Sequence, residues 1–142
     1  MTLVIDASVA LKWFVEEQGS DRARGLLSRE ERLIAPELLL AEVFNAAWRL
    51  LRGGHMVAEQ YDIVLARLAS AIADFVPLRP IVSRAAAIGR ALDHPIYDCF
   101  YLALAERASA ALVTADRRFL NRIAGSPWQP VVQDLYGLAP GT

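Results

Sequence analysis

Short, almost unbroken apolar segments alternate along the chain with longer segments in which apolar residues recur at helical spacing. Brief apolar runs of this kind are typical of parallel strands that are covered on both faces. The predicted strands are 3–5, 33–35, 75–78, 112–114 and 131–133. The predicted helices are 9–15, 21–28, 37–52, 57–73, 81–92, 96–108 and 117–124. This alternation, without repeats or a linker, predicts one α/β domain over residues 1–142.

The two longest helical segments carry apolar stripes with a period near 3.6 residues. The turn Gly53-Gly54 lies between them and ends the first. Because a short glycine turn joins antiparallel helices, we expect 37–52 and 57–73 to form a helical hairpin.

Composition excludes several classes of protein. The chain has 142 residues and a single cysteine, Cys99, so a disulfide framework and a thiolate zinc cage are excluded. No apolar run approaches the ~18 residues of a membrane span, and the N-terminus lacks a signal-peptide pattern. We therefore expect a cytoplasmic protein. The 15 Lys and Arg residues balance 16 Asp and Glu residues, which argues against a broad basic surface for nucleic acid.

Four acidic residues occupy positions that are typical of a catalytic or metal-binding site. Asp6 follows the first predicted strand and Asp116 follows the fourth. The carboxyl ends of parallel strands meet at one edge of a sheet, so these two should lie together. Asp98 falls in the first turn of the helix after Pro95, and Glu42 interrupts an apolar run and points inward or along the core margin.

Each acid also has a structural explanation. Asp6 and Asp116 can cap the helices that follow them, and Asp98 can complement a helix dipole. Glu42 can pair with Arg49 or with Arg84. If several acids converge, a cation-binding site is favoured over these structural roles. Carboxylates without counter-charges repel one another unless cations lie among them.

Oxygen ligands without nearby histidine or cysteine favour Mg²⁺ or Mn²⁺ over zinc. One or two such ions suit phosphoryl chemistry, because they activate water, orient a phosphodiester and stabilise the leaving oxygen. Ser8, Thr114 and Asn45 lie two or three residues from an acid and are expected to support the site.

In these residues the chain resembles the PIN-domain ribonucleases, and most closely the VapC toxins of bacterial toxin-antitoxin pairs. The resemblance runs from about residue 3 to 135. It rests on Val4-Ile5-Asp6-Ala7-Ser8, Glu42-Val43-Phe44-Asn45, Ile96-Tyr97-Asp98-Cys99 and Thr114-Ala115-Asp116-Arg117. It implies a three-layer α/β/α fold, with a short, mostly parallel sheet of about five strands flanked by about seven helices.

The resemblance further implies that Asp6, Glu42, Asp98 and Asp116 form a metal site. The expected activity is that of a Mg²⁺- or Mn²⁺-dependent endoribonuclease, in which a metal-activated water attacks phosphorus and leaves a 5′-phosphate and a 3′-hydroxyl. It also implies a homodimer that acts as the toxin of a type II toxin-antitoxin system. A small antitoxin would wrap the apolar helices and reach the acids.

Some residues near these motifs suggest roles in binding. Lys12, Arg117, Arg118 and Arg122 are candidate RNA contacts, although a solvated helix face explains the arginines equally well. The apolar first helix, with Trp13 and Phe14, is a candidate partner groove.

Three other residues are expected to have no catalytic role. We interpret His94 as a residue restrained by Pro95 at a helix start, His55 as a solvated turn residue, and Cys99 as a buried, unreactive thiol.

Other functions remain open. One is a PIN nuclease of RNA processing or turnover that has no antitoxin, and another is a non-catalytic PIN-like module that binds RNA or protein. A phosphoacceptor receiver also places acids around Mg²⁺, but it needs a lysine at a late strand end. Lys12, near the N-terminus, is the single lysine.

Overall fold

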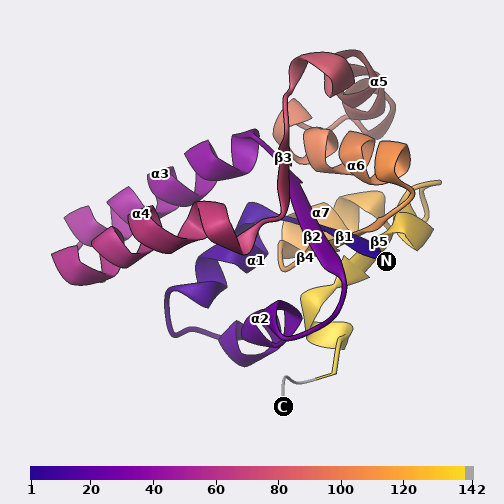
Figure 1. Cartoon of the computed structure of the whole chain (residues 1–142). Coiled ribbons are helices and arrows are strands. Elements are labelled where there is room, and N and C mark those ends of the chain that lie inside the picture. Colours follow the sequence, from indigo (N-terminus) through magenta and orange to yellow (C-terminus); the bar gives the residue numbers. More distant parts are fainter. Residues whose placement is uncertain (140–142) are drawn as a thin grey trace.

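A five-stranded parallel sheet, with strand order β3-β2-β1-β4-β5, forms the centre of the computed structural model (Figure 1). The structure describes residues 1–139. The strands are β1 (Thr2–Ile5), β2 (Arg32–Pro36), β3 (Asp74–Val76), β4 (Ala111–Thr114) and β5 (Val132–Asp134). All the predicted strands are present, and the parallel pairing confirms the expected sheet.

Helices cover both faces of the sheet, which gives the expected three-layer α/β/α arrangement. Figure 1 shows α5 and α6 above the strands and α1 and α2 below them. The helices are α1 (Ala7–Ala10), α2 (Ser20–Leu27), α3 (Leu38–Arg52), α4 (Ala58–Ala71), α5 (Val82–Leu92), α6 (Ile96–Ala108) and α7 (Arg117–Ile123). The helices α3 and α4 pack side by side and extend from the sheet, which confirms the predicted hairpin.

The first helix differs from the prediction of 9–15. It begins at Ala7, because the Asp6 side chain accepts a hydrogen bond from the Ala7 backbone N–H and caps the helix. After Ala10 the chain tightens into a 3₁₀ turn, Leu11–Trp13. Periodicity predicted the apolar surface of this segment but not the short α-helix followed by a tighter turn.

The junction between α4 and β3 also differs from the prediction. Helix α4 ends at Ala71 rather than at residue 73, because Ile72 already has an extended backbone. Strand β3 then begins at Asp74 and ends at Val76, where the sequence pattern predicted 75–78. Leu78 instead precedes the 3₁₀ turn Arg79–Ile81.

The central strands and α6 contribute a large part of the core, next to the edge of the sheet where β1 and β4 end. Val4, Ile5 and Val113 are fully buried, and α6 packs across β1, β2 and β4. The parallel pairing of β1 with β4 places the residues that follow the two strands at one edge of the sheet. Within residues 1–139 no helix is both long and apolar enough to cross a membrane.

Replacing a core residue should cost far more stability than the same change on the surface. Leu112 in β4 is 1% exposed, whereas Leu65 on α4 is 56% exposed. We expect Leu112→Ala to lower the free energy of unfolding by about 2–5 kcal/mol, because it leaves a cavity in the sheet core. The control Leu65→Ala should change it by less than about 0.5 kcal/mol. Urea denaturation measures both, and equal losses would contradict this packing.

Candidate active site

Asp6 lies at the carboxyl end of β1 and is almost fully buried, at 6% exposure. Its Oδ1 accepts the backbone N–H of Ala7 at 2.9 Å. Its Oδ2 accepts the Ser8 hydroxyl at 2.6 Å and the Thr114 hydroxyl at 2.7 Å. Asp6 therefore caps α1, as its structural explanation predicted, and also belongs to a polar network between two strand ends.

The same network fixes the loop that follows β4. The Thr114 hydroxyl accepts the backbone N–H of Asp116 at 3.1 Å, and Ser8 Oγ accepts the N–H of Ala115 at 3.0 Å. Two hydroxyl groups thus link Asp6 to the backbone that carries Asp116. The structure places Ser8 and Thr114 in contact with Asp6, as the supporting role requires.

Asp116 caps α7 and keeps one oxygen available. Its Oδ1 accepts the backbone N–H groups of Arg118 at 3.0 Å and Phe119 at 3.2 Å. Its Oδ2 makes no hydrogen bond within residues 1–139. A helix cap and a ligand are therefore compatible roles for one carboxylate, because each role uses a different oxygen.

Asp98, in the first turn of α6, is held by a residue that sequence reasoning set aside. His94 Nε2 and Asp98 Oδ2 are 2.6 Å apart. The imidazole also packs against the Phe119 ring, with centroids 5.5 Å apart. His94 is thus more than a residue restrained by proline: it orients Asp98. Its spacing of four residues before Asp98 was the signal, because a side chain just ahead of a helix can reach the first turn of that helix.

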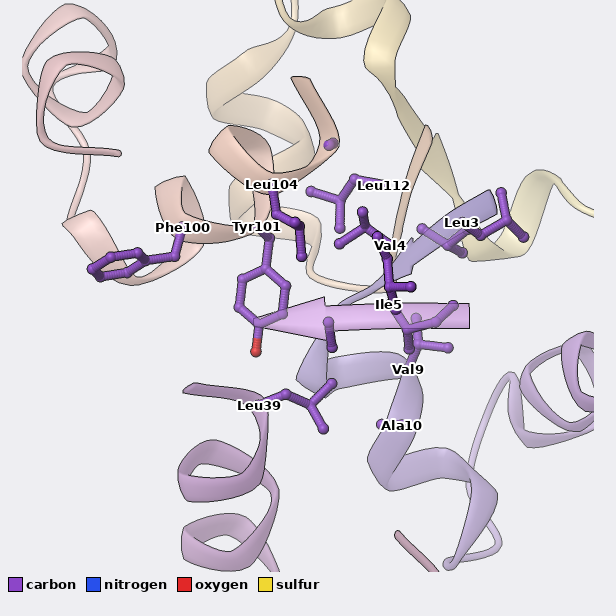
Figure 2. Packing of buried hydrophobic residues seen from close by; sticks show 14 of the residues in the cluster. Leu3, Val4, Ile5, Val9, Ala10, Leu39, Phe100, Tyr101, Leu104 and Leu112 are labelled. Atoms are coloured by element: carbon purple, nitrogen blue, oxygen red, sulfur yellow. The ribbon is translucent and has the colours of Figure 1, made fainter. Parts of the chain in front are cut away.

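Glu42 is held by Tyr101, not by the arginines that its structural explanation named. The Tyr101 hydroxyl donates to Glu42 Oε1 at 2.6 Å, whereas Arg84 pairs with Glu106 at 2.7 Å. Figure 2 shows the Tyr101 ring extending from α6 toward α3, the helix that carries Glu42. Sequence reasoning missed Tyr101, because 59 residues separate it from its partner.

Burial and mutual repulsion raise the pKa values of three acids. Burial is the main cause that raises the pKa of Asp6 to about 6; the Ser8 and Thr114 hydroxyls lower it in part, and the charges of Asp98 and Asp116 add a smaller rise. Burial, followed by the other acids, raises the pKa of Glu42 to about 7. Burial also raises the pKa of Asp98, while His94 lowers it. The charges of Asp98 and Asp116 act on Asp6, and the charges of all three aspartates act on Glu42, so the four carboxyl groups lie near one another.

The donor set fits a hard divalent cation. Among residues 1–139, only Asp98 of the four acids has a basic group within 4.0 Å, and that group is His94. No three Asp, Glu, His or Cys side chains in this range are grouped tightly enough to bind an ion alone. Mg²⁺ binds through one or two carboxylates and keeps several waters, so a loose set of acids suits it.

The remaining predicted site residues lie in different surroundings. Asn45 is exposed and makes no side-chain hydrogen bond within residues 1–139. The Lys12 ammonium is buried and donates to Glu17 Oε1 at 3.0 Å and to the Gln18 carbonyl at 2.7 Å, so it stabilises a loop. Arg117 pairs with Asp134 at 3.1 Å.

Two interpretations from the sequence are confirmed. His55 is exposed in the turn between α3 and α4, as expected of a solvated residue. Cys99 is fully buried, and burial raises the pKa of its thiol to about 11, which agrees with an unreactive cysteine.

Comparison with known proteins gives a consistent family assignment. The model of the PIN domain family matches residues 3–125. Ribonuclease VapC3 of Pyrobaculum aerophilum is 30% identical over 128 residues, which cover 86% of this chain and 95% of the relative.

Two solved structures are similar in fold. One is a toxin-antitoxin complex from Klebsiella pneumoniae, with a TM-score of 0.71 and 17% identity, covering 96% of this chain and all of that chain. The other is VapBC2 from Rickettsia felis bound to a DNA fragment from their promoter, with a TM-score of 0.67 and 13% identity, covering 94% and 98%. At these identities the likeness concerns the fold.

The raised pKa of Glu42 predicts how stability depends on pH without divalent cations. The folded state holds a proton that the unfolded chain releases, since the pKa rises from 4.5 to about 7 on folding. We expect the free energy of unfolding to fall as pH rises through that interval and then level off. Glu42→Gln should reduce this slope and stabilise the protein at neutral pH, as measured by thermal unfolding at several pH values.

The matched control is Glu59→Gln, at an exposed position on α4. It should leave the slope unchanged. Mg²⁺ should raise the midpoint temperature of thermal unfolding of the parent protein at neutral pH, because a ligand that binds only the folded state stabilises that state. An identical slope in the parent and in Glu42→Gln would show that Glu42 does not carry the shifted proton.

Proposed function

The chain belongs to the PIN domain family, and from this we propose that it is a Mg²⁺- or Mn²⁺-dependent endoribonuclease. The observation that carries the proposal is the convergence of Asp6, Glu42, Asp98 and Asp116, none of which has an arginine or lysine partner within residues 1–139. Burial, together with the charges of neighbouring acids, raises the pKa values of the first three. Buried acids without counter-charges need a cation, and an all-oxygen set favours a hard one. The relative named Ribonuclease VapC3 supports RNA as the substrate.

The four acids would have different roles at the cleavage site. Asp98, Asp116 and Glu42 each have one oxygen without a partner in the described chain, which leaves that oxygen for a cation. Asp6 shapes the centre through its hydroxyl partners, and Glu42, poised near neutral pH, can hold or release a proton beside it. When bound, one or two divalent ions supply the positive charge that activates water and stabilises the leaving oxygen.

The proposal extends to a toxin that a small antitoxin inhibits, with the toxin as a homodimer. The two solved neighbours are toxin-antitoxin complexes, which supports this partner. A hollow of about 490 Å³ between α2, the 3₁₀ turn and α4 is large enough for apolar side chains of a partner helix. Its lining is mainly apolar and consists of Trp13, Phe14, Leu27, Ile63, Arg67, Ser70 and Ala71.

Trp13 contributes less to this hollow than the sequence suggested. It is 7% exposed, and its indole N–H donates to the Ala23 carbonyl at 2.8 Å, so the ring belongs mainly to the core. Ile63 and Leu27, which are nearly half exposed, present more apolar surface to a partner.

Removing the charge of one acid should abolish cleavage without unfolding the protein. In Asp98→Asn the amide can still bond to His94 but no longer attracts a cation. We expect RNA cleavage to fall by more than about 100-fold, because even the partners of metal ligands account for about 10- to 100-fold. Cleavage of labelled RNA by the purified protein measures this.

The control for this experiment is Asp62→Asn, which removes an exposed acid on α4. Asp62→Asn should cleave RNA at the rate of the parent, and EDTA should stop RNA cleavage by the parent and by this control. Parental activity in a correctly folded Asp98→Asn would overturn the assignment of the site.

A charge in the apolar hollow should block the partner while sparing catalysis. We expect Ile63→Asp to prevent co-purification with the product of a short neighbouring reading frame, because the carboxylate would be desolvated in the interface. Its RNA cleavage should match that of the parent. The exposed Asp62→Asn serves again as the control, and undiminished co-purification of Ile63→Asp would place the antitoxin elsewhere.

A further inference from the structure

A second hollow, of about 480 Å³, lies next to the acidic site and has the opposite chemical character. Two guanidinium groups, an amide and an imidazole line it, from Arg118, Arg122, Asn121 and His94. None of these lining residues is acidic. Concave surfaces with clustered guanidinium groups favour anions, and phosphate in particular.

The hollow shares residues with the acidic site. His94 lines it and also bonds to Asp98 Oδ2 at 2.6 Å. Arg118 lines it, and its backbone N–H donates to Asp116 Oδ1 at 3.0 Å. The positive hollow and the carboxylates are therefore immediate neighbours, so one extended molecule can contact both.

Helix α7 presents the polar groups together. Arg118, Asn121 and Arg122 are spaced i, i+3 and i+4, which places them on one face of the helix. Phe119 and Ile123 are almost fully buried and anchor the opposite face. The polar face is thus held in place by core packing.

The two arginines of the hollow retain their hydrogen-bonding capacity. Within residues 1–139 neither Arg118 nor Arg122 has a carboxylate within 4.0 Å. Arg117, their neighbour, pairs with Asp134 and lies over the Tyr136 ring. Of the candidate RNA contacts in the described chain, Arg118 and Arg122 are therefore the two whose charges are free, whereas Arg117 and Lys12 are already engaged.

We infer that this hollow is a substrate subsite that binds a backbone phosphate of single-stranded RNA adjacent to the phosphodiester that is cut. This inference rests on the proposed function, because it takes the acids to be the place of cleavage. Arg118 and Arg122 bind the phosphate, and Asn121 offers an amide to the same nucleotide. His94, which lines the hollow and bonds to Asp98, connects the two sites.

Salt dependence of RNA binding tests the subsite without requiring cleavage. The probe is a short, unstructured, fluorescently labelled RNA, bound in Ca²⁺ and checked by electrophoresis to be intact. For single strands, each phosphate that a protein neutralises adds about 0.7 to the steepness with which log affinity falls against log salt. We expect Arg118→Ala and Arg122→Ala each to weaken binding at low salt and to reduce this steepness by up to that amount.

The matched control is Arg107→Ala. Arg107 is an exposed arginine without an ion pair in the described chain, nine residues beyond Asp98 along α6. Its slope should equal that of the parent. Equal slopes in all the variants, or no binding of the RNA by the parent, would overturn the subsite. Thermal unfolding confirms that each variant is folded.

Cleavage of the same RNA in Mg²⁺ separates this inference from the proposed function. If the parent cuts, Arg118→Ala and Arg122→Ala should raise KM and leave kcat nearly unchanged, because the contact binds substrate and transition state alike. If the arginine variants have a reduced salt slope but the parent does not cleave RNA, the phosphate subsite is supported and the proposed nuclease activity is wrong. If the parent cleaves RNA and the arginine variants keep its salt slope and its KM, the nuclease activity is supported and the phosphate subsite is wrong.

Discussion

The parallel pairing of β1 with β4 is the constraint on which the rest of the site depends. The backbone N–H of Asp6 donates to the Val113 carbonyl at 3.1 Å, so both strands end at the same level of the sheet. The Thr114 hydroxyl can then donate a hydrogen bond to the Asp6 carboxylate and also accept one from the Asp116 backbone N–H. Backbone and short hydroxyl groups make these contacts, so the fold itself sets where the two acids stand.

This arrangement has an electrostatic cost that the hydrogen bonds only partly offset. The hydroxyls of Ser8 and Thr114 stabilise ionised Asp6, yet its pKa remains raised because burial and the other acids outweigh them. Glu42 has one strong partner, Tyr101, and its pKa is raised as well, to about 7. Functional sites commonly retain such local conflicts, which the surrounding fold tolerates. Here the conflict is the kind that a bound cation relieves, since positive charge favours the ionised form of every acid.

The sequence predicted the parts of the site that follow directly from strand ends. Asp6 and Asp116 come after short apolar segments, so their meeting required only that the strands be parallel and adjacent. The sequence could not predict the partners that hold Glu42 and Asp98 in place. Tyr101 on α6 reaches Glu42 on α3 across 59 residues of sequence, a tertiary contact with no local pattern. His94 did have a local signal, its i, i+4 spacing, but Pro95 favoured a purely structural interpretation.

The near-neutral charge of the chain conceals a separation of charges that the structure makes concrete. Setting aside the four site acids leaves 15 cations against 12 acids, since 16 − 4 = 12. Two of those cations, Arg118 and Arg122, line a hollow that shares His94 with the acidic site. The acids alone would repel an RNA backbone, whereas the arginines alone would hold it without cutting it. Under the proposed function, the two neighbouring surfaces attract the same strand only when a cation neutralises the acids, so RNA binding and metal binding should be coupled.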